Sequence, residues 1–150
     1  MKKLSSYIGL VLMGLILIGG KDASAQTKTK KEAVLWSAED LKWEQLAGGP
    51  PGVMGVMLWG DNTKGAYGGM TKFPAGFKAP LHFHTDATKI VVIKGAYVYN
   101  GKKYGPGSYV YVPGGVKHES GGAADSESVF FIEQSSKFDF VPVAAPKETK

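Results

Sequence analysis

Three histidines are the residues of this sequence best suited to hold a metal ion, and the chain contains no others. His82 and His84 are one residue apart, and His118 follows in a second short motif. Side chains alternate across a β-strand, so His82 and His84 would share one face, with Cα atoms about 6.6–6.8 Å apart. Two imidazoles at that spacing can share one ion at about 2.1 Å per nitrogen. The pattern predicts a metal site that His118 completes from a neighbouring strand.

Short β-strands are the elements that would position these histidines. After the break at residues 48–52 (GGPPG), apolar runs alternate with turn residues at the 8–12-residue spacing typical of all-β domains. Asn100-Gly101 predicts a type I′ hairpin, because both residues tolerate positive φ. The expected strands are 53–59, 66–73, 78–84, 88–94, 96–99, 102–104, 108–112, 116–120, 128–134 and 138–141. Upstream, Ser37 and Asp40 predict a short capped turn, or else a loop before a strand at 42–46.

The N-terminus has the pattern of a secretory signal peptide at residues 1–25. Lys2 and Lys3 precede an apolar run at residues 7–18, and Ala23-Ser24-Ala25 is a small-residue cleavage site. The run is shorter than the roughly 20 residues that cross a bilayer, although an uncleaved anchor is the alternative. We therefore expect a periplasmic or secreted protein with no membrane attachment after cleavage. A flexible basic lead-in (26–34), one domain (35–142) and a flexible tail (143–150) would follow.

Charge and cysteine content exclude several classes of function. The formal net charge is +5, but much of it lies in lysines near the two ends, and no basic stripe interleaved with aromatics occurs in the interior. We therefore expect no nucleic-acid partner. The chain has no cysteine, which excludes disulfides and thiolate chemistry. Any metal must be held by histidine, carboxylate, carbonyl or water.

The two histidine motifs resemble those of the cupin superfamily. The first cupin motif, G-x5-H-x-H-x3,4-E-x6-G, is matched by Gly76, His82, His84 and Gly95. The second, G-x5-P-x-G-x2-H-x3-N, is matched by Gly107, Pro113, Gly115 and His118. The resemblance implies a single-domain cupin jelly-roll barrel, the double-stranded β-helix. Within the superfamily, the sequence most resembles the ChrR-like subgroup, which has small exported or anti-sigma-associated members.

Two positions depart from the cupin pattern. Thr88 occupies the glutamate position, and Gly122 occupies the final asparagine position. Without the glutamate, three neutral imidazoles would leave a divalent site with a net charge of +2 and more open coordination positions. Asp86 has the strand parity of His82 and His84, so it could supply an oxygen directly or through water, or merely shape the turn. Thr88 could hold a bound water or a ligand oxygen.

The resemblance leaves the function open between three readings. Cupin dioxygenases that lack the glutamate ligand bind Fe(II), which implies an enzyme acting on a small chelating substrate. ChrR-like cupin domains imply instead a non-catalytic module that binds or senses a small ligand through a metal. The third reading is a β scaffold with a purely structural site. The expected cofactor is a divalent ion, Fe(II), Zn or Mn, and no residue stands out as a general base.

Tyr109 and Tyr111 suggest a further contact. In the expected strand 108–112, Val110 and Val112 would face the core, so the two tyrosines would face the other way. They would then pack against a second subunit, giving a homodimer, or lie exposed as a tyrosine pair on a β surface.

Overall fold

The computed structural model describes residues 32–144 of the 150-residue chain. The chain divides into units at residues 1–34 and 35–150, and every strand of the described part belongs to the second unit. The expected signal peptide (1–25), most of the basic lead-in and the last six residues of the tail lie outside the described residues. None of the helical segments within residues 32–144 has the length and apolar character needed to span a bilayer.

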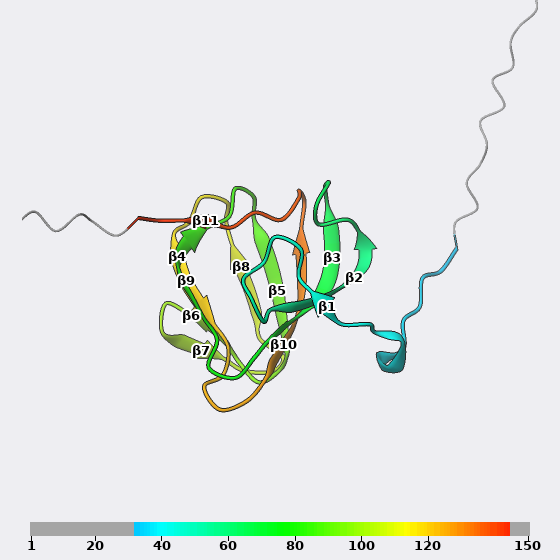
Figure 1. Cartoon of the computed structure of the whole chain (residues 1–150), viewed down its shortest axis with the longest axis horizontal. Helices are drawn as coiled ribbons and strands as arrows, with labels where there is room; N and C mark the ends of the chain where they lie inside the picture. Colours follow the sequence, from blue (N-terminus) through cyan, green and yellow to red (C-terminus); the bar gives the residue numbers. More distant parts are fainter. Residues whose placement is uncertain (1–31, 145–150) are drawn as a thin grey trace, which may run out of the picture. The chain divides into compact units, whose positions relative to one another are not determined.

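The second unit is built from two antiparallel sheets that face each other (Figure 1). The six-stranded sheet has the order β1 (Glu44–Gln45), β2 (Met54–Gly60), β3 (Tyr67–Phe73), β10 (Ser128–Gln134), β5 (Thr88–Lys94) and β8 (Tyr109–Val112). The five-stranded sheet has the order β11 (Val141–Pro142), β4 (Lys78–Phe83), β9 (His118–Gly121), β6 (Tyr97–Tyr99) and β7 (Lys102–Tyr104). From β3 onward the chain passes repeatedly from one sheet to the other. The predicted all-β cupin jelly roll is confirmed.

The core lies between the two sheets. In β5, Thr88, Ile90 and Val92 are buried while the alternate residues are more exposed, which is the two-residue period of a strand with one face inward. The buried apolar cluster consists of Ile90, Val92, Tyr97, Val110, Val112 and Phe130. This packing fixes the positions of the strands that carry the histidines.

Two turns show why glycine is required at particular places. Asn100 and Gly101 have φ values of 46° and 80°, so the hairpin between β6 and β7 has the positive φ at both positions that a type I′ turn needs. Gly95 has a φ of 70°, and a Cβ there would lie 2.6 Å from the Glu127 carbonyl oxygen. Any larger residue at position 95 would combine backbone strain with a steric clash.

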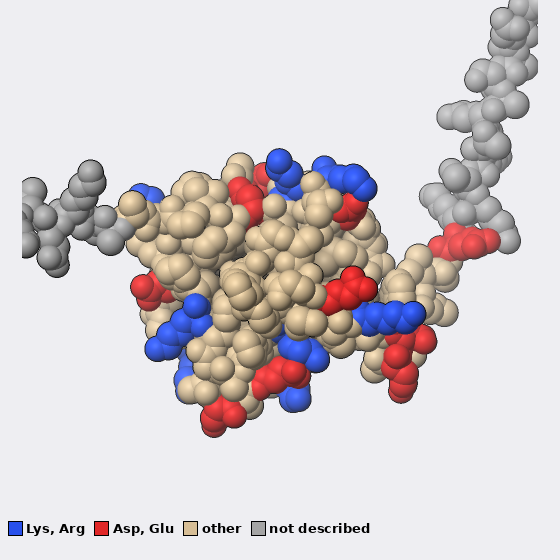
Figure 2. All heavy atoms as spheres, in the orientation of Figure 1, with Lys and Arg blue, Asp and Glu red and all other residues tan. Residues whose placement is uncertain are grey.

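The outer surface carries mixed charges. On the face shown in Figure 2, lysines and acidic side chains are interspersed rather than gathered by sign. Across the six-stranded sheet, Lys89 pairs with Glu133 at 2.7 Å, and Glu127 lies 3.4 Å from Lys72 and 3.6 Å from Lys94. Such exposed pairs contribute little to stability.

The structure corrects several predicted boundaries. The strand predicted at 138–141 is wrong for residues 138–140, because β11 begins only at Val141. Residues 138–140 instead turn their aromatic rings toward two histidines and bond the loop after β4, so no strand ladder forms there. Strand β4 ends at Phe83, which places His84 just beyond it. Strand β9 begins at His118 rather than at residue 116, and Val116 is exposed. The N-terminal turn is a 3₁₀ helix, η1 (Ala38–Asp40).

Candidate metal centre

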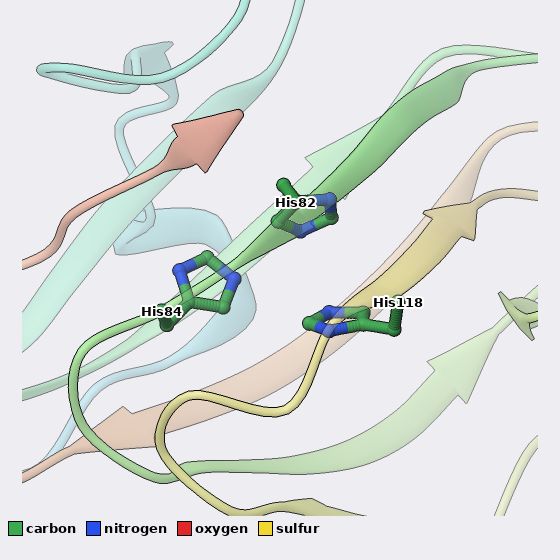
Figure 3. Close-up of side chains that lie close together, drawn as sticks. All are labelled: His82, His84 and His118. Carbon is green, nitrogen blue, oxygen red and sulfur yellow. The ribbon is translucent and has the colours of Figure 1, made fainter. Parts of the chain in front are cut away.

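Two of the three histidines face each other directly across a strand pair. Strands β4 and β9 run antiparallel with His82 opposite His118, and the two ring centroids are 4.3 Å apart. The His84 ring lies 5.0 Å from that of His82 and 5.7 Å from that of His118. Figure 3 shows the three side chains converging on one region, and one nitrogen of each lies within 4.8 Å of the others. The structure thus brings together the three histidines that the two sequence motifs predicted to lie at one site.

Backbone carbonyls determine which nitrogen of each histidine ring carries the proton and which keeps a lone pair for a metal. Nδ1 of His82 lies 2.7 Å from the Pro80 carbonyl oxygen, and Nδ1 of His118 lies 2.9 Å from that of Val116. Nδ1 of His84 contacts the carbonyl oxygen of Asp139. A carbonyl can only accept a hydrogen bond, so each Nδ1 carries the proton and each Nε2 keeps its lone pair. Three imidazoles oriented in this way are the usual donor set for a divalent transition metal.

Aromatic side chains hold the imidazole rings in place. Phe140 stacks on His82 with centroids 4.3 Å apart, and Tyr99 stacks on His118 at 5.2 Å. Phe138 lies 5.7 Å from His84 in a tilted arrangement. Each ring therefore has a neighbour that limits its rotation, in addition to the hydrogen bond on Nδ1. These contacts orient the three rings of the site.

Burial favours the neutral form of His82 and of His84. His82 is 2% exposed and His118 is 1% exposed. Burial lowers the pKa of His82 to about 4, although its hydrogen bond to Pro80 acts in the opposite direction. Burial also lowers the pKa of His84. At neutral pH these two rings are in the deprotonated form that binds metals.

A glycine turn joins the two motifs. Gly115 has a φ of 77°, and its N–H donates to the His84 carbonyl oxygen at 2.8 Å. A Cβ on Gly114 would lie 2.3 Å from the carbonyl oxygen of Thr85. The turn before β9 therefore packs closely against the loop after β4, and only glycines allow this approach. This contact explains why both glycine-containing motifs are needed to bring three histidines together.

Asp139 is a functional candidate that our sequence reasoning missed. Its carboxylate accepts hydrogen bonds from the Thr85 N–H at 3.0 and 3.1 Å and from the Thr85 hydroxyl, while its carbonyl bonds His84. We define residues 138–140 as the aromatic strap, because they cover the site with Phe138 and Phe140 and fix it through Asp139. The alternating pattern Phe138-Asp139-Phe140 resembles a strand in the sequence, which concealed this role.

The histidines line a small cavity of about 60 Å³ between the sheets. A single water needs roughly 10–15 Å³ of such space, so the cavity has room for a few waters or a small ligand. Its other lining residues are mostly apolar, with hydroxyl groups on Tyr67, Thr71, Thr88, Tyr97 and Ser120. Among the described residues that line it, none is an aspartate, glutamate, lysine or arginine. A metal held here would have no carboxylate neighbour in the cavity.

The remaining predicted site residues lie in different places. Thr88 is buried, lines the cavity and accepts a hydrogen bond from Gln134. Asp86 is half-buried in the loop before β5, outside both the cavity lining and the histidine group. Tyr67 also lines the cavity, and Gln134 behind it hydrogen-bonds both Tyr67 and Thr88; nothing in their local sequence indicated this.

Fold and site together define a cupin with a three-histidine cluster that could hold a metal ion. The chain belongs to the ChrR cupin-like domain family, whose sequence profile matches residues 31–137. This finding confirms the resemblance drawn from the two motifs. None of the curated proteins matches the chain.

Solved structures share the fold. A protein of unknown function with a cupin-like fold from Ralstonia eutropha JMP134 is 25% identical, with a TM-score of 0.60 over 71% of this chain and 69% of that one. The polyketide cyclase RemF from Streptomyces resistomycificus is 17% identical, with a TM-score of 0.59 over 80% and 89%. The complex of SigE with the anti-sigma ChrR from Rhodobacter sphaeroides is 20% identical, with a TM-score of 0.54 over 66% and 52%.

Proposed function

We propose that this protein is an exported, metal-dependent cupin that holds Fe(II), Zn or Mn through His82, His84 and His118. The three histidines would leave coordination positions on the ion for a small chelating ligand, and the protein would act on this ligand as a dioxygenase-type enzyme. The observation that carries the proposal is the set of three Nδ1–carbonyl hydrogen bonds, because they leave three Nε2 lone pairs beside one cavity. A purely structural role for the histidines would not require all three to share this orientation.

The residues of the chain have distinct parts in this proposal. The three imidazoles bind the ion and leave positions free, because no carboxylate among the cavity-lining residues completes the shell. The aromatic strap and the apolar walls exclude bulk water from the ligand. When bound, a divalent ion supplies Lewis acidity and, in the case of iron, the redox chemistry of oxygen activation. Specificity would come from the shape of the cavity and from those hydroxyl groups that contact the ligand.

A second candidate function is a binding or sensing module without turnover. The cavity-lining residues include no carboxylate or lysine that could act as a general acid or base. The family profile, that of the ChrR cupin-like domain, also supports this candidate. In this case the same ion would bind a small ligand reversibly, and the ligand would leave unchanged.

The metal content and oxygen uptake of the purified protein distinguish the two candidates. The protein would be purified without added metal, analysed by mass spectrometry for metals, and then assayed with β-diketones and small thiols in an oxygen electrode. Iron together with substrate-dependent oxygen uptake supports the enzyme. Zinc, no uptake and tight binding of a small molecule support the binding module. Absence of any metal, with a melting temperature that a chelator does not change, would overturn both.

Export is part of the proposal and has its own test. The charged start, the apolar run at 7–18 and the small residues 23–25 support it. Expression in the native cell, followed by fractionation and N-terminal sequencing, should give a periplasmic or extracellular protein that begins at Gln26. A full-length protein found only in the cytoplasmic fraction would contradict export without affecting the metal site.

A further inference from the structure

A buried chain of three polar side chains ends at the cavity. The Tyr67 hydroxyl donates to Gln134 Oε1 at 2.8 Å, and Gln134 Nε2 donates to the Thr88 hydroxyl oxygen at 2.5 Å. The three residues come from the adjacent strands β3, β10 and β5, where Gln134 lies opposite both Tyr67 and Thr88 in the register. All three are almost completely buried, and Tyr67 and Thr88 line the cavity that the histidines also line.

The direction of these hydrogen bonds determines whether the three side chains present a hydrogen-bond donor or an acceptor to the cavity. An amide has one acceptor oxygen and one donor nitrogen, so Gln134 can accept from one hydroxyl while it donates to the other. Burial raises the pKa of Tyr67 above its usual range, so this phenol keeps its proton and donates. The Thr88 oxygen accepts, and its own proton meets no acceptor within residues 32–144. Thr88 is 2% exposed, so this proton is directed toward a ligand or water in the cavity rather than bulk solvent.

The charge of the cavity favours one kind of ligand. Three neutral imidazoles do not compensate a divalent ion, and the described lining residues supply no carboxylate. A buried, uncompensated charge is costly, so the ligand itself is the natural source of negative charge. An anionic oxygen satisfies both demands, because it neutralises the ion and accepts the Thr88 proton in a charge-assisted hydrogen bond.

We propose that Tyr67, Gln134 and Thr88 form a polarised donor chain that makes the metal site selective for small ligands with an anionic oxygen, such as a carboxylate or an enolate. Thr88 touches the ligand, and Tyr67 and Gln134 are positioning residues that turn its proton toward the cavity. This inference rests on the proposed metal site and deepens it by naming the class of ligand. The cavity volume of about 60 Å³ restricts that class to a few heavy atoms beyond the ion.

Anion binding to the cobalt-loaded protein tests the donor chain without relying on turnover. The protein would be loaded with Co(II) and titrated with acetate, a small carboxylate, while the visible absorption of the cobalt is recorded. Imidazole serves as a neutral comparison ligand, because its free nitrogen donates a hydrogen bond and cannot accept one. Thr88→Val keeps the shape of the side chain and removes the hydroxyl, so acetate should bind about tenfold more weakly. Affinity for cobalt and for imidazole should not change.

Two further variants separate the donor chain from general polarity. Thr71→Val makes the same change at another cavity-lining residue, one that does not belong to the donor chain. Its acetate affinity should stay as in the wild type. Tyr67→Phe releases the Gln134 amide, which can then turn its oxygen toward Thr88 and withdraw the proton from the cavity. This variant should lose acetate affinity by several-fold while it keeps the hydroxyl of Thr88.

The outcomes are distinguishable. Equal acetate affinity in the wild type and Thr88→Val, an equal loss in Thr71→Val, or no acetate binding by the cobalt-loaded wild type would overturn the donor chain alone. Should Thr88→Val not fold, unchanged acetate affinity in Tyr67→Phe overturns it. Failure of the wild type to bind cobalt would overturn the proposed metal site together with this inference.

Discussion

At the scale of single residues, the backbone carbonyls that accept from Nδ1 of the histidines determine which ring nitrogen is available to a metal. Pro80 and Val116 each lie two residues before the histidine whose Nδ1 they bind, so these two contacts are local in sequence. The partner of His84 is instead Asp139, which is 55 residues away in sequence. His82 and His118 are therefore oriented by their own motifs, while His84 depends on the tertiary structure.

Replacement of each histidine with alanine tests ligation directly. Removal of one imidazole should lower metal affinity by more than the roughly 10- to 100-fold that loss of a ligand's hydrogen-bond partner costs. Metal content after dialysis against a competing chelator measures this loss for His82→Ala, His84→Ala and His118→Ala. Glu119→Ala, next to His118 but exposed, is the matched control and should retain the metal. Full occupancy in any one histidine variant would remove that residue from the ligand set.

The stability of the metal-free protein should depend on pH because of His82. Its pKa is about 4 in the folded protein and about 6.5 in the unfolded chain, so the unfolded state binds more protons between these values. This contribution is complete above pH 6.5 and is lost as the pH falls toward 4. Melting temperatures of the chelator-treated protein should therefore fall over this range. The His82→Asn variant should show a smaller decrease, and an equal decrease in both proteins would contradict the assignment.

At the scale of elements, the aromatic strap is the segment on which the site depends most. Phe138 donates its N–H to the Asn62 carbonyl oxygen at 2.7 Å, and Val143 donates to that of Leu81 at 2.9 Å. The first bond fixes the start of the strap, and the second holds the chain just after β11, which follows the strap directly. Between them, Asp139 is the residue that bonds the loop carrying His84.

Asp139→Ala should loosen the strap while the sheets remain intact. The variant loses the carboxylate that binds Thr85, so the His84 ring should become less well oriented and metal affinity should fall by roughly tenfold. Hydrogen exchange followed by mass spectrometry should show faster exchange at residues 138–140 and 84–85, with β5 and β10 unaffected. Asp125→Ala, an exposed aspartate in another loop, is the control. Unchanged exchange in the strap would contradict its dependence on Asp139.

Most strands were predictable because their signal is local. The bounds of β5, β7 and β10 agree with the prediction to the residue, since turn residues mark where these strands begin or end. The histidine cluster was predictable because its two motifs carry their own turns and spacing. The strap was not predictable, because its conformation results from contacts with His84 and Thr85, which lie in the loop after β4 and are far from it in sequence. Tyr67 and Gln134 were missed for the same reason, as they are 67 residues apart in sequence.

At the scale of the whole molecule, the outer face of the six-stranded sheet carries the tyrosine pair on which the predicted homodimer depends. Tyr109 and Tyr111 are 61% and 55% exposed on β8, which is an edge strand. Their cross-strand neighbours on β5 are Val91 and Lys89. The predicted outward direction of the tyrosines is thus present in the structure, and the homodimer remains a prediction.

Sedimentation velocity tests the homodimer. If this face is an interface, the wild type should sediment as a dimer, and the double variant Tyr109→Ser/Tyr111→Ser should sediment as a monomer because it loses apolar contact area. Val116→Ser, which changes an exposed apolar residue on a different loop, should leave the dimer intact. A wild type that stays monomeric at high concentration would rule out this interface.

The double attachment of the aromatic strap has a consequence for the exchange of small molecules. The strap lines the cavity and also supplies the carbonyl that orients His84, so a strap that moved aside to admit a ligand would release His84 from that contact at the same moment. Ligand binding and metal retention would then be thermodynamically linked, and each would strengthen the other by the same factor. The protein would lose its ion most readily when the cavity is empty. Scarcity of the small ligand would in that way promote release of the metal.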